Sequence, residues 1–350
     1  YNETDNKFVA TKIPLDDKGV ISLFHDTSAL GITPDDIGGC PVGCLGIPEF
    51  GTDFVIQMVV DTKPQTLSDL IRISGLSHGT DVWLNNAQEL IRSGKATIST
   101  AICTRDDIMT YLINKGMDSE QSFTIMERVR KGAVAKGKCK EWPQFKEDMK
   151  AHDVPDWYVW SCEKIKYMFP KAHAAAYVMM AWRIAYCKIN YPLAYYASYF
   201  SIRASAFSYE LMCQGQAYLE QVMADYRRRS DTLSKKEQDS YKDMKVVQEM
   251  YVRGYDFVPI DIFTADSRNF QIVDDNHLMP SLSSIDGLGD RAADAIVEAA
   301  KDGPFLSKDD FRDRTKVSKT VTDLMDSLHL LGNLPESNQI SLFDLQMGVG

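Results

Sequence analysis

The sequence has no apolar run as long as a membrane span, and no secretory signal opens it. Its seven cysteines are odd in number and widely scattered, which predicts reduced thiols in a cytoplasmic setting rather than a disulfide framework. Cys40 and Cys44 have a spacing compatible with zinc, but no second Cys or His pair follows them closely. The remaining composition, 44% hydrophobic and 25% charged, is typical of a soluble globular protein.

An excess of positive charge is also missing. The net charge is −10, the wrong sign for a protein whose whole surface attracts nucleic acid. The charges are segregated, however, because residues 128–171 hold eleven Lys and Arg against six Asp and Glu. Any contact with phosphate is therefore expected to be local. The 350 residues suffice for two or three domains, and a start at Tyr1 rather than Met predicts a piece of a longer protein.

Helical periodicity dominates what is present, since apolar residues recur at intervals of three and four. The pattern predicts a mainly α protein with small β elements, an α+β class. Helices are expected over 52–60, 67–73, 83–93, 105–115, 119–130, 142–151, 155–167 and 170–189. Two more are expected within 207–254, separated by a polar hinge at 229–234. Short strands are predicted over 257–262 and 270–273, with a turn at 274–276, before a helical pattern from 283 to 331.

The most informative segment is Phe169-Pro-Lys-Ala-His-Ala-Ala-Ala-Tyr177. Pro170 suits a first helical position, and His173 and Tyr177 share a face because they stand four residues apart. Lys171 falls in the first turn, where an anion is favoured. Small residues between them let a flat ligand approach the backbone. The segment therefore fits a surface for a base and a triphosphate, but also an ordinary core helix.

A second motif is Ile285-Asp-Gly-Leu-Gly-Asp-Arg-Ala-Ala293, a glycine hairpin that opens a helix with Ala293, Ile296 and Val297 facing inward. Its form resembles a helix-hairpin-helix, whose backbone amides bind a phosphate of duplex DNA without reading bases. Gly287, Leu288, Gly289 and Arg291 are the candidate contacts. A second, weaker unit is expected over 305–332. Glycine pairs also end many ordinary helices, which is the alternative interpretation.

A third motif lies near the end of the chain, at Gln339, Ser341, Leu342 and Phe343. Adjacent apolar residues beside a glutamine, after the polar segment 335–337, are typical of a short linear motif with two anchors for a pocket. The alternative is a final helix that folds back on the core.

Together these motifs resemble the C-terminal part of the C-family bacterial replicative DNA polymerases, the α subunit of DNA polymerase III, of the PolC type. The resemblance covers essentially the whole chain. It also runs through residues 46–51, 73–83, 105–109 and 195–200. The related DnaE type carries a further domain after the hairpin, whereas this sequence ends soon after a segment similar to a clamp-binding motif. The loop 132–142 is longer and richer in Lys than expected for the family.

The resemblance implies a division into four parts. Residues 1–50 would connect to a palm and thumb, 51–205 would form the fingers, and 206–338 would bind duplex DNA with a tandem helix-hairpin-helix at 283–332. Residues 339–350 would bind the sliding clamp. The implied partners are primer-template DNA, the incoming deoxynucleoside triphosphate (dNTP), the sliding clamp and other replisome subunits, with no membrane.

The resemblance also implies residue roles. Arg105, Arg130 and Lys171 would bind the triphosphate, His173 and Tyr177 would pack against the nascent base pair, and the same pocket would be lined by Ser74, Gly75 and His78. A structural ion pair is the alternative for Arg105, and Asp81 is expected to be a helix cap. Mg²⁺ would be held by palm aspartates outside this chain, since the pairs at 16–17, 35–36 and 106–107 are expected to be caps or surface. The fragment alone would then be inactive within a DNA-directed DNA polymerase. A non-enzymatic DNA-binding scaffold is the alternative function.

Overall fold

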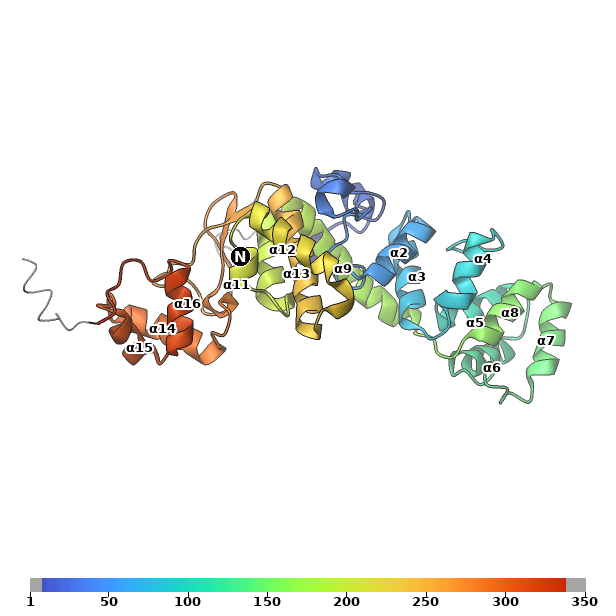
Figure 1. Ribbon diagram of the computed structural model, residues 1–350. Helices are drawn as coiled ribbons and strands as arrows, with labels where there is room; N and C mark the ends of the chain where they lie inside the picture. Colours follow the sequence, from blue (N-terminus) through green and yellow to red (C-terminus); the bar gives the residue numbers. More distant parts are fainter. Residues whose placement is uncertain (1–7, 338–350) are drawn as a thin grey trace, which may run out of the picture. The chain divides into compact units, whose positions relative to one another are not determined.

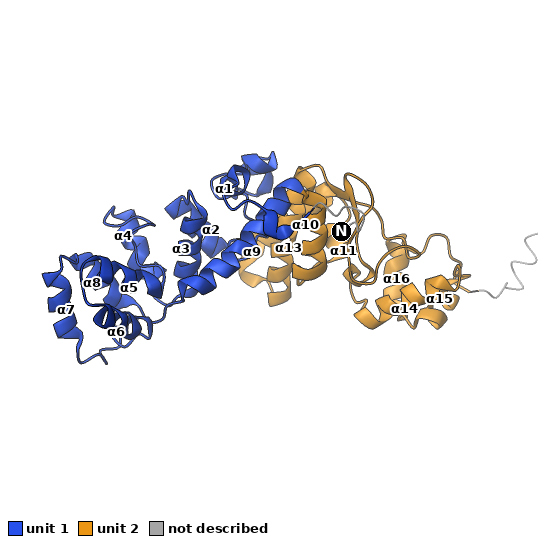
Figure 2. Ribbon diagram, turned by 180° about the vertical axis from the view of Figure 1, so that it is seen from behind, with its two compact units in different colours: residues 1–190 blue, residues 191–350 orange. Residues whose placement is uncertain are grey.

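The computed structural model describes residues 8–337, so the expected tail motif at 339 and 341–343 lies outside the described residues. The protein is mainly α with one small sheet, which confirms the expected fold class. The chain divides into two compact units, residues 1–190 and 191–350 (Figure 2).

Helices build the first unit (Figure 1). They are α1 (Lys18–Ser22), α2 (Asp53–Thr62), α3 (Leu67–His78), α4 (Gln88–Arg92), α5 (Arg105–Asn114), α6 (Ser119–Arg130), α7 (Trp142–Ala151), α8 (Asp156–Lys164) and α9 (Lys171–Asn190). The long helix α9 packs against α1 and α3, and α5 packs against α6. Most expected helices are therefore present, with ends displaced by a few residues.

Carboxylates begin several of these helices, as expected for the acidic pairs. The Asp17 side chain accepts the N–H of Val20 at the start of α1, and Asp36 forms a capping box with Thr33. Asp107 does the same with Thr104 at the start of α5. Such caps satisfy amide groups that have no partner inside the helix.

The expected helix over 83–93 is wrong for its first half. Leu84, Asn85 and Asn86 have non-helical backbone angles, and only α4 remains regular. The reason is the buried side chain of Asn86, which donates to the Asp81 carbonyl at 3.0 Å and accepts from the Ser161 hydroxyl at 2.6 Å. These distant polar contacts outweigh the local apolar pattern. Asp81 is not a cap either, because its carboxylate pairs with Lys166 at 2.7 Å.

The helix expected to end at 167 ends instead at Lys164. Beyond it the chain is extended, and Thr80 exchanges backbone hydrogen bonds with this segment: its N–H donates to the Tyr167 carbonyl at 2.9 Å, and its carbonyl accepts from Lys166 N–H at 3.0 Å. The bridge fixes the path of the chain just before α9 begins.

The second unit combines seven α-helices with a three-stranded sheet among the described residues. They are α10 (Pro192–Ser198), α11 (Tyr209–Met212), α12 (Gln216–Arg228), α13 (Lys235–Val252), α14 (Asp290–Lys301), α15 (Lys308–Thr315) and α16 (Lys319–Ser327), with β1 (Asp256–Phe257), β2 (Gln271–Ile272) and β3 (His277–Met279). The hinge expected at 229–234 separates α12 from α13, which pack together.

The sheet differs from the expected pair of strands. Its order is β1-β3-β2, with β1 parallel and β2 antiparallel to the central strand β3, which was not predicted. The first expected strand stops after Phe257, two residues before Pro259, which has no N–H to donate to a ladder. The expected turn is present, since Asp274 accepts the N–H groups of Asn276 and His277.

The helices α14 to α16 share a core with the preceding loop. Its buried side chains include Leu282, Ile285, Leu288, Ala293, Ile296, Phe311, Val321 and Met325. The expected inward register of α14 is confirmed for Ala293 and Ile296, while Val297 packs at the edge.

Candidate nucleotide and duplex interfaces

The first turns of α5 and α9 are tied together by backbone contacts. The Asp106 carboxylate accepts the N–H of Lys171 at 2.7 Å, and the N–H of Arg105 donates to the Phe169 carbonyl at 3.1 Å. The helix start that the sequence singles out is thus attached to a second helix start 65 residues earlier in the chain. This junction places Lys171 and Arg105 near each other.

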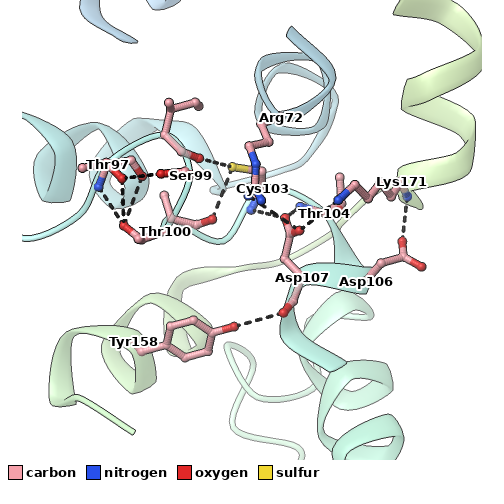
Figure 3. Close-up of polar contacts among 12 residues, drawn as sticks. Arg72, Thr97, Ser99, Thr100, Cys103, Thr104, Asp106, Asp107, Tyr158 and Lys171 are labelled. Atoms are coloured by element: carbon pink, nitrogen blue, oxygen red, sulfur yellow. Dashed lines mark hydrogen bonds and ion pairs between the residues drawn. The ribbon is translucent and has the colours of Figure 1, made fainter. Parts of the chain in front are cut away.

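Asp107 is the centre of the same junction (Figure 3). Its carboxylate accepts the N–H groups of Cys103 at 3.1 Å and Thr104 at 2.8 Å. It also lies 3.7 Å from an Arg72 guanidinium nitrogen and 3.9 Å from the Lys171 ammonium. The Lys171 side chain keeps 44% of its surface exposed, whereas that of Asp107 keeps 13%. The carboxylate therefore lies beside the ammonium end of a lysine whose side chain still reaches solvent.

A row of rings runs along the exposed side of this junction. Phe169 lies 5.2 Å from His173 between ring centres, and His173 lies 4.7 Å from Tyr177. Tyr167 and His78 contact Phe169 at 5.7 Å and 5.3 Å. His173 is exposed, and Tyr177 keeps 43% of its surface open. The helical spacing thus produces a ring surface that begins beside Lys171.

The two arginines expected at the triphosphate have different surroundings. Arg105 lies 4.0 Å from the Asp106 carboxylate, so the ion pair considered as its alternative role is present. Arg130 binds both oxygens of Glu127, which lowers the pKa of that carboxyl to about 2 and raises the pKa of Arg130. Arg130 is consequently engaged at the end of α6, while Arg105 lies at the junction with Lys171.

The three residues of α3 that were expected to line the nucleotide pocket also have different surroundings. Ser74 is buried and its hydroxyl donates to Glu49 at 3.4 Å, and His78 contacts the same carboxylate oxygen from a more exposed position. Gly75 faces the loop before α5, where a Cβ atom would lie 2.6 Å from the Cys103 carbonyl oxygen. Of the three, His78 reaches the ring row, whereas Ser74 and Gly75 pack beneath it.

Sequence reasoning assigned no role to Arg72, Glu49 or Phe169, which the structure brings into this junction. Two signals were available: Arg72 directly precedes the matched segment 73–83, and Glu49 lies within the matched segment 46–51. Neither signal indicates which other segment the residue contacts, because these contacts join residues far apart in the chain.

The glycine hairpin before α14 presents backbone rather than side chains. Gly287 has φ 78°, a left-handed conformation that favours glycine, and Gly289 immediately precedes the helix. Both are exposed, as is Arg291. Leu288 is only 4% exposed and its N–H donates to the Ile285 carbonyl at 3.0 Å, so this residue anchors the hairpin in the core.

The start of α14 differs from those of its two neighbours. Ser307 and Ser318 cap α15 and α16 through their hydroxyls, but the corresponding residue of α14 is Gly289, which has no side chain to do so. The turn between α15 and α16 contains Lys316 in the left-handed region, at φ 60°. A second helix pair therefore lies where the weaker unit was expected.

Comparison with known proteins adds two family models. Residues 1–153 match the bacterial DNA polymerase III alpha subunit finger domain, and residues 254–339 match a helix-hairpin-helix motif. The chain is 51% identical over 334 residues to a protein from Caldanaerobacter subterraneus subsp. tengcongensis named DNA polymerase III PolC-type. Proteins of the same name from Streptococcus pneumoniae and Streptococcus pyogenes are 50% identical over 335 residues and 49% identical over 334 residues.

The chain is homologous to a segment of PolC-type DNA polymerase III. Each of these three alignments covers 95% of this chain and 23% of the relative, so the chain spans about a quarter of their length. The finger-domain model contains α1 to α7 and stops before α8 and α9, whereas the PolC alignments cover nearly the whole chain. The region of α9 that carries the ring row is therefore matched only by the PolC relatives among these comparisons, whereas the α14 hairpin is also matched by the helix-hairpin-helix model.

Among the described residues, the acidic side chains of the expected pairs have local partners. Asp17, Asp36 and Asp107 cap helices, and Asp106 accepts the N–H of Lys171. Within residues 8–337 no group of three or more His, Cys, Asp or Glu side chains is arranged to hold a metal ion. No helix in the same range is long and apolar enough to cross a membrane.

Proposed function

We propose that this chain supplies the nucleotide-binding and duplex-binding parts of a PolC-type DNA-directed DNA polymerase. The finger-domain match and the PolC relatives support this assignment. Catalytic Mg²⁺ is assigned to residues outside this chain, because the acidic pairs of the described part serve as caps. The chain then contributes positioning and charge, and the metal chemistry belongs to the rest of the polymerase.

The observation that carries the proposal is the arrangement at the start of α9. Two cations, Lys171 and Arg105, lie at one end of a row of rings that includes His173 and Tyr177. A dNTP has the matching order of groups, with a polyanion at one end and a flat base at the other. In the proposed complex the triphosphate contacts the cations, where guanidinium and ammonium donors bind phosphate oxygens. His173 and Tyr177 then pack against the nascent base pair.

Duplex binding is assigned to the hairpin before α14. Gly289 has φ −75°, which any residue adopts, and a Cβ atom there would meet nothing within 4 Å. No contact among the described residues therefore requires glycine at this position. A phosphate that approaches the amides of the first turn of α14 supplies such a requirement, because helix N-termini bind anions through backbone N–H groups.

The clamp-binding role of Gln339, Ser341, Leu342 and Phe343 remains a proposal that rests on the motif alone. Deletion of residues 339–343 from the full-length polymerase should abolish the stimulation of synthesis by the sliding clamp and leave distributive synthesis unchanged. The measurement is product length on primed single-stranded DNA with and without clamp. Equal stimulation of the deletion variant would remove this assignment.

The nucleotide assignment is tested with Lys171→Ala in the full-length polymerase. We expect the apparent affinity for all four dNTPs to fall about tenfold, since one charge-assisted contact to phosphate is lost, while primer-template affinity is retained. Single-turnover incorporation over a range of dNTP concentrations gives the values. The matched control is Lys146→Ala, which removes an exposed lysine of α7 that pairs with Glu163. Unchanged dNTP affinity in Lys171→Ala would refute the triphosphate assignment.

A non-enzymatic DNA-binding scaffold is the competing function. It predicts duplex binding that is indifferent to added nucleotide. The proposed polymerase function predicts instead that the correct dNTP tightens the complex of the full-length protein with a primer-template whose primer ends in a 3′-deoxy nucleotide. Fluorescence anisotropy with a correct and an incorrect dNTP separates the two.

A further inference from the structure

Arg183 has an unusual environment for a basic residue. It lies on α9, is half-buried, and its Nε atom is buried with no hydrogen-bond partner among residues 8–337. Nor does an ion pair join its guanidinium to a carboxylate in this part of the chain. Other arginines do have such partners: Arg130 binds Glu127, and Arg92 binds Asp61 at 2.9 Å. The lack of a carboxylate partner for Arg183 among the described residues is the more unusual because the chain has ten more acidic than basic residues.

A buried donor without a partner costs about 1–3 kcal/mol, and folded proteins keep few of them, some of which a water molecule or an ion satisfies. The planar guanidinium group has donors arranged to match a phosphate or a carboxylate. Because no carboxylate of the described chain occupies that position, an external anion can bind Arg183 without displacing an internal partner.

The position of Arg183 on α9 indicates which anion it would bind. The buried side of the helix is formed by Ala174, Val178, Ala181, Trp182, Ala185 and Lys188. His173, Tyr177 and Met180 follow the exposed side at steps of four and three, and Arg183 comes three residues after Met180, which is 42% exposed. The side that begins beside the proposed triphosphate site and carries the rings therefore continues to Arg183.

The length of this side is close to the width of a base pair. Lys171 and Arg183 are twelve residues apart, which is about 18 Å along an α-helix. That span is comparable to the separation of the two sugar-phosphate backbones across a base pair. With the triphosphate at Lys171 and the nascent pair against His173 and Tyr177, the opposite backbone lies near Arg183.

We propose that Arg183 binds a backbone phosphate of the template strand next to the templating nucleotide. This inference rests on the proposed nucleotide site and extends it across the base pair. A phosphate contact carries no sequence information, which suits an enzyme that copies every template. Arg183 would thus hold the templating base opposite the incoming dNTP while the rings contact the pair.

The test combines Arg183→Ala with DNA in which one template phosphate at a time is replaced by a neutral methylphosphonate. In the full-length wild-type polymerase, neutralising the contacted phosphate should weaken primer-template binding about tenfold. Arg183→Ala should show a similar loss on unmodified DNA and less than a twofold further loss on the modified DNA, because the two changes remove one contact. The apparent dNTP affinity at saturating DNA should stay within twofold of wild type.

Two further variants separate phosphate binding from charge and packing. Arg92→Ala removes one positive charge that is already paired with Asp61, and it should bind every modified template like wild type. Arg183→Gln should retain the wild-type melting temperature, because the Nε atom has no partner to lose in the described part of the chain, and should bind DNA like Arg183→Ala. A lower melting temperature with full sensitivity to every methylphosphonate would assign Arg183 a packing role and overturn the inference.

The outcomes also distinguish this inference from the function on which it rests. If Lys171→Ala lowers dNTP affinity but Arg183→Ala is additive with a methylphosphonate at every template position, only the template contact is refuted. If Lys171→Ala leaves dNTP affinity unchanged, the nucleotide site itself is refuted. Coupling to a primer-strand phosphate alone would also overturn the assignment to the template.

Discussion

The starts of α9 and α14 are both helix N-termini near which we assign phosphate groups, yet they are built in opposite ways. At α9 the N–H of Lys171 is already bound by the Asp106 carboxylate, so a ligand there would meet the side chains of Lys171 and Arg105, which lie 3.9 Å and 4.0 Å from carboxylates. At α14 the capping residue is Gly289, which has no side chain to bind the backbone amides of the first turn. A triphosphate would therefore be bound by side chains and a duplex phosphate by backbone.

The carboxylates of the two units differ as well. Asp107 accepts backbone N–H groups while it lies beside Arg72 and Lys171. Asp243 in α13 is buried, and it accepts the N–H of Ala206 at 2.9 Å and the hydroxyl of Tyr199 at 3.4 Å. Both carboxylates accept backbone N–H groups, but only Asp107 also places a negative charge beside two cations, Arg72 and Lys171. Asp243 instead places its carboxyl group in an apolar interior.

The largest effect is expected from Gly75→Ala, which disturbs the support of the α9 start. The new Cβ would meet the Cys103 carbonyl oxygen at 2.6 Å and the Thr104 methyl carbon at 2.7 Å. We expect the free energy of unfolding to fall by about 2–3 kcal/mol, because backbone at such a distance must shift. Thermal denaturation measures the loss, with Gly289→Ala as the matched control. A stability equal to wild type would show that the α3 contact is not needed.

The second effect concerns the buried carboxyl of Asp243. Burial raises its pKa from 3.8 to about 6. Between those values the folded state binds more protons than the unfolded state, so stability should fall as pH rises from about 4 through about 6, by about 3 kcal/mol in all, and level off above about pH 7. The difference between wild type and Asp243→Asn in urea denaturation at several pH values isolates this contribution. A flat difference across that window would contradict it.

The hairpin glycines should separate stability from binding. Gly287→Ala places a side chain at φ 78° and should cost about 1 kcal/mol of folding stability. Gly289→Ala should leave the melting temperature unchanged but weaken duplex binding about fivefold, because a methyl group lies where the phosphate approaches. Fluorescence anisotropy on blunt duplex DNA measures the binding. Unchanged affinity for Gly289→Ala would break the contrast between the two helix starts.

The smallest effect is expected from Asp107→Asn. The amide oxygen still accepts the N–H of Thr104, but the negative charge 3.9 Å from Lys171 is gone. We expect apparent dNTP affinity to increase about threefold at low salt and to match wild type at high salt, where surface charges are screened. Asp118→Asn, which changes the cap of α6, is the control. A loss of dNTP affinity would instead show that Asp107 must be charged to orient Lys171.

Much of the fold follows from local patterns. The apolar spacing predicted most helices because each must bury one side, and the hinge at 229–234 and the turn at Asp274 have polar residues suited to those sites. The failures occur where distant residues decide. The helix expected from residue 83 is broken by Asn86, whose partner Ser161 lies 75 residues away, and β3 forms only as the partner of both other strands.

The candidate site shows the same division. The sequence by itself determined that Lys171, His173 and Tyr177 lie near one another, since helical spacing sets their order, and that a glycine hairpin precedes α14. Only the tertiary structure decided that Asp106 and Asp107 hold Lys171, that Glu127 engages Arg130, and that the Nε atom of Arg183 has no partner among residues 8–337. The physical reason is that periodicity fixes neighbours within one helix, whereas charge balance depends on which other segments pack against it.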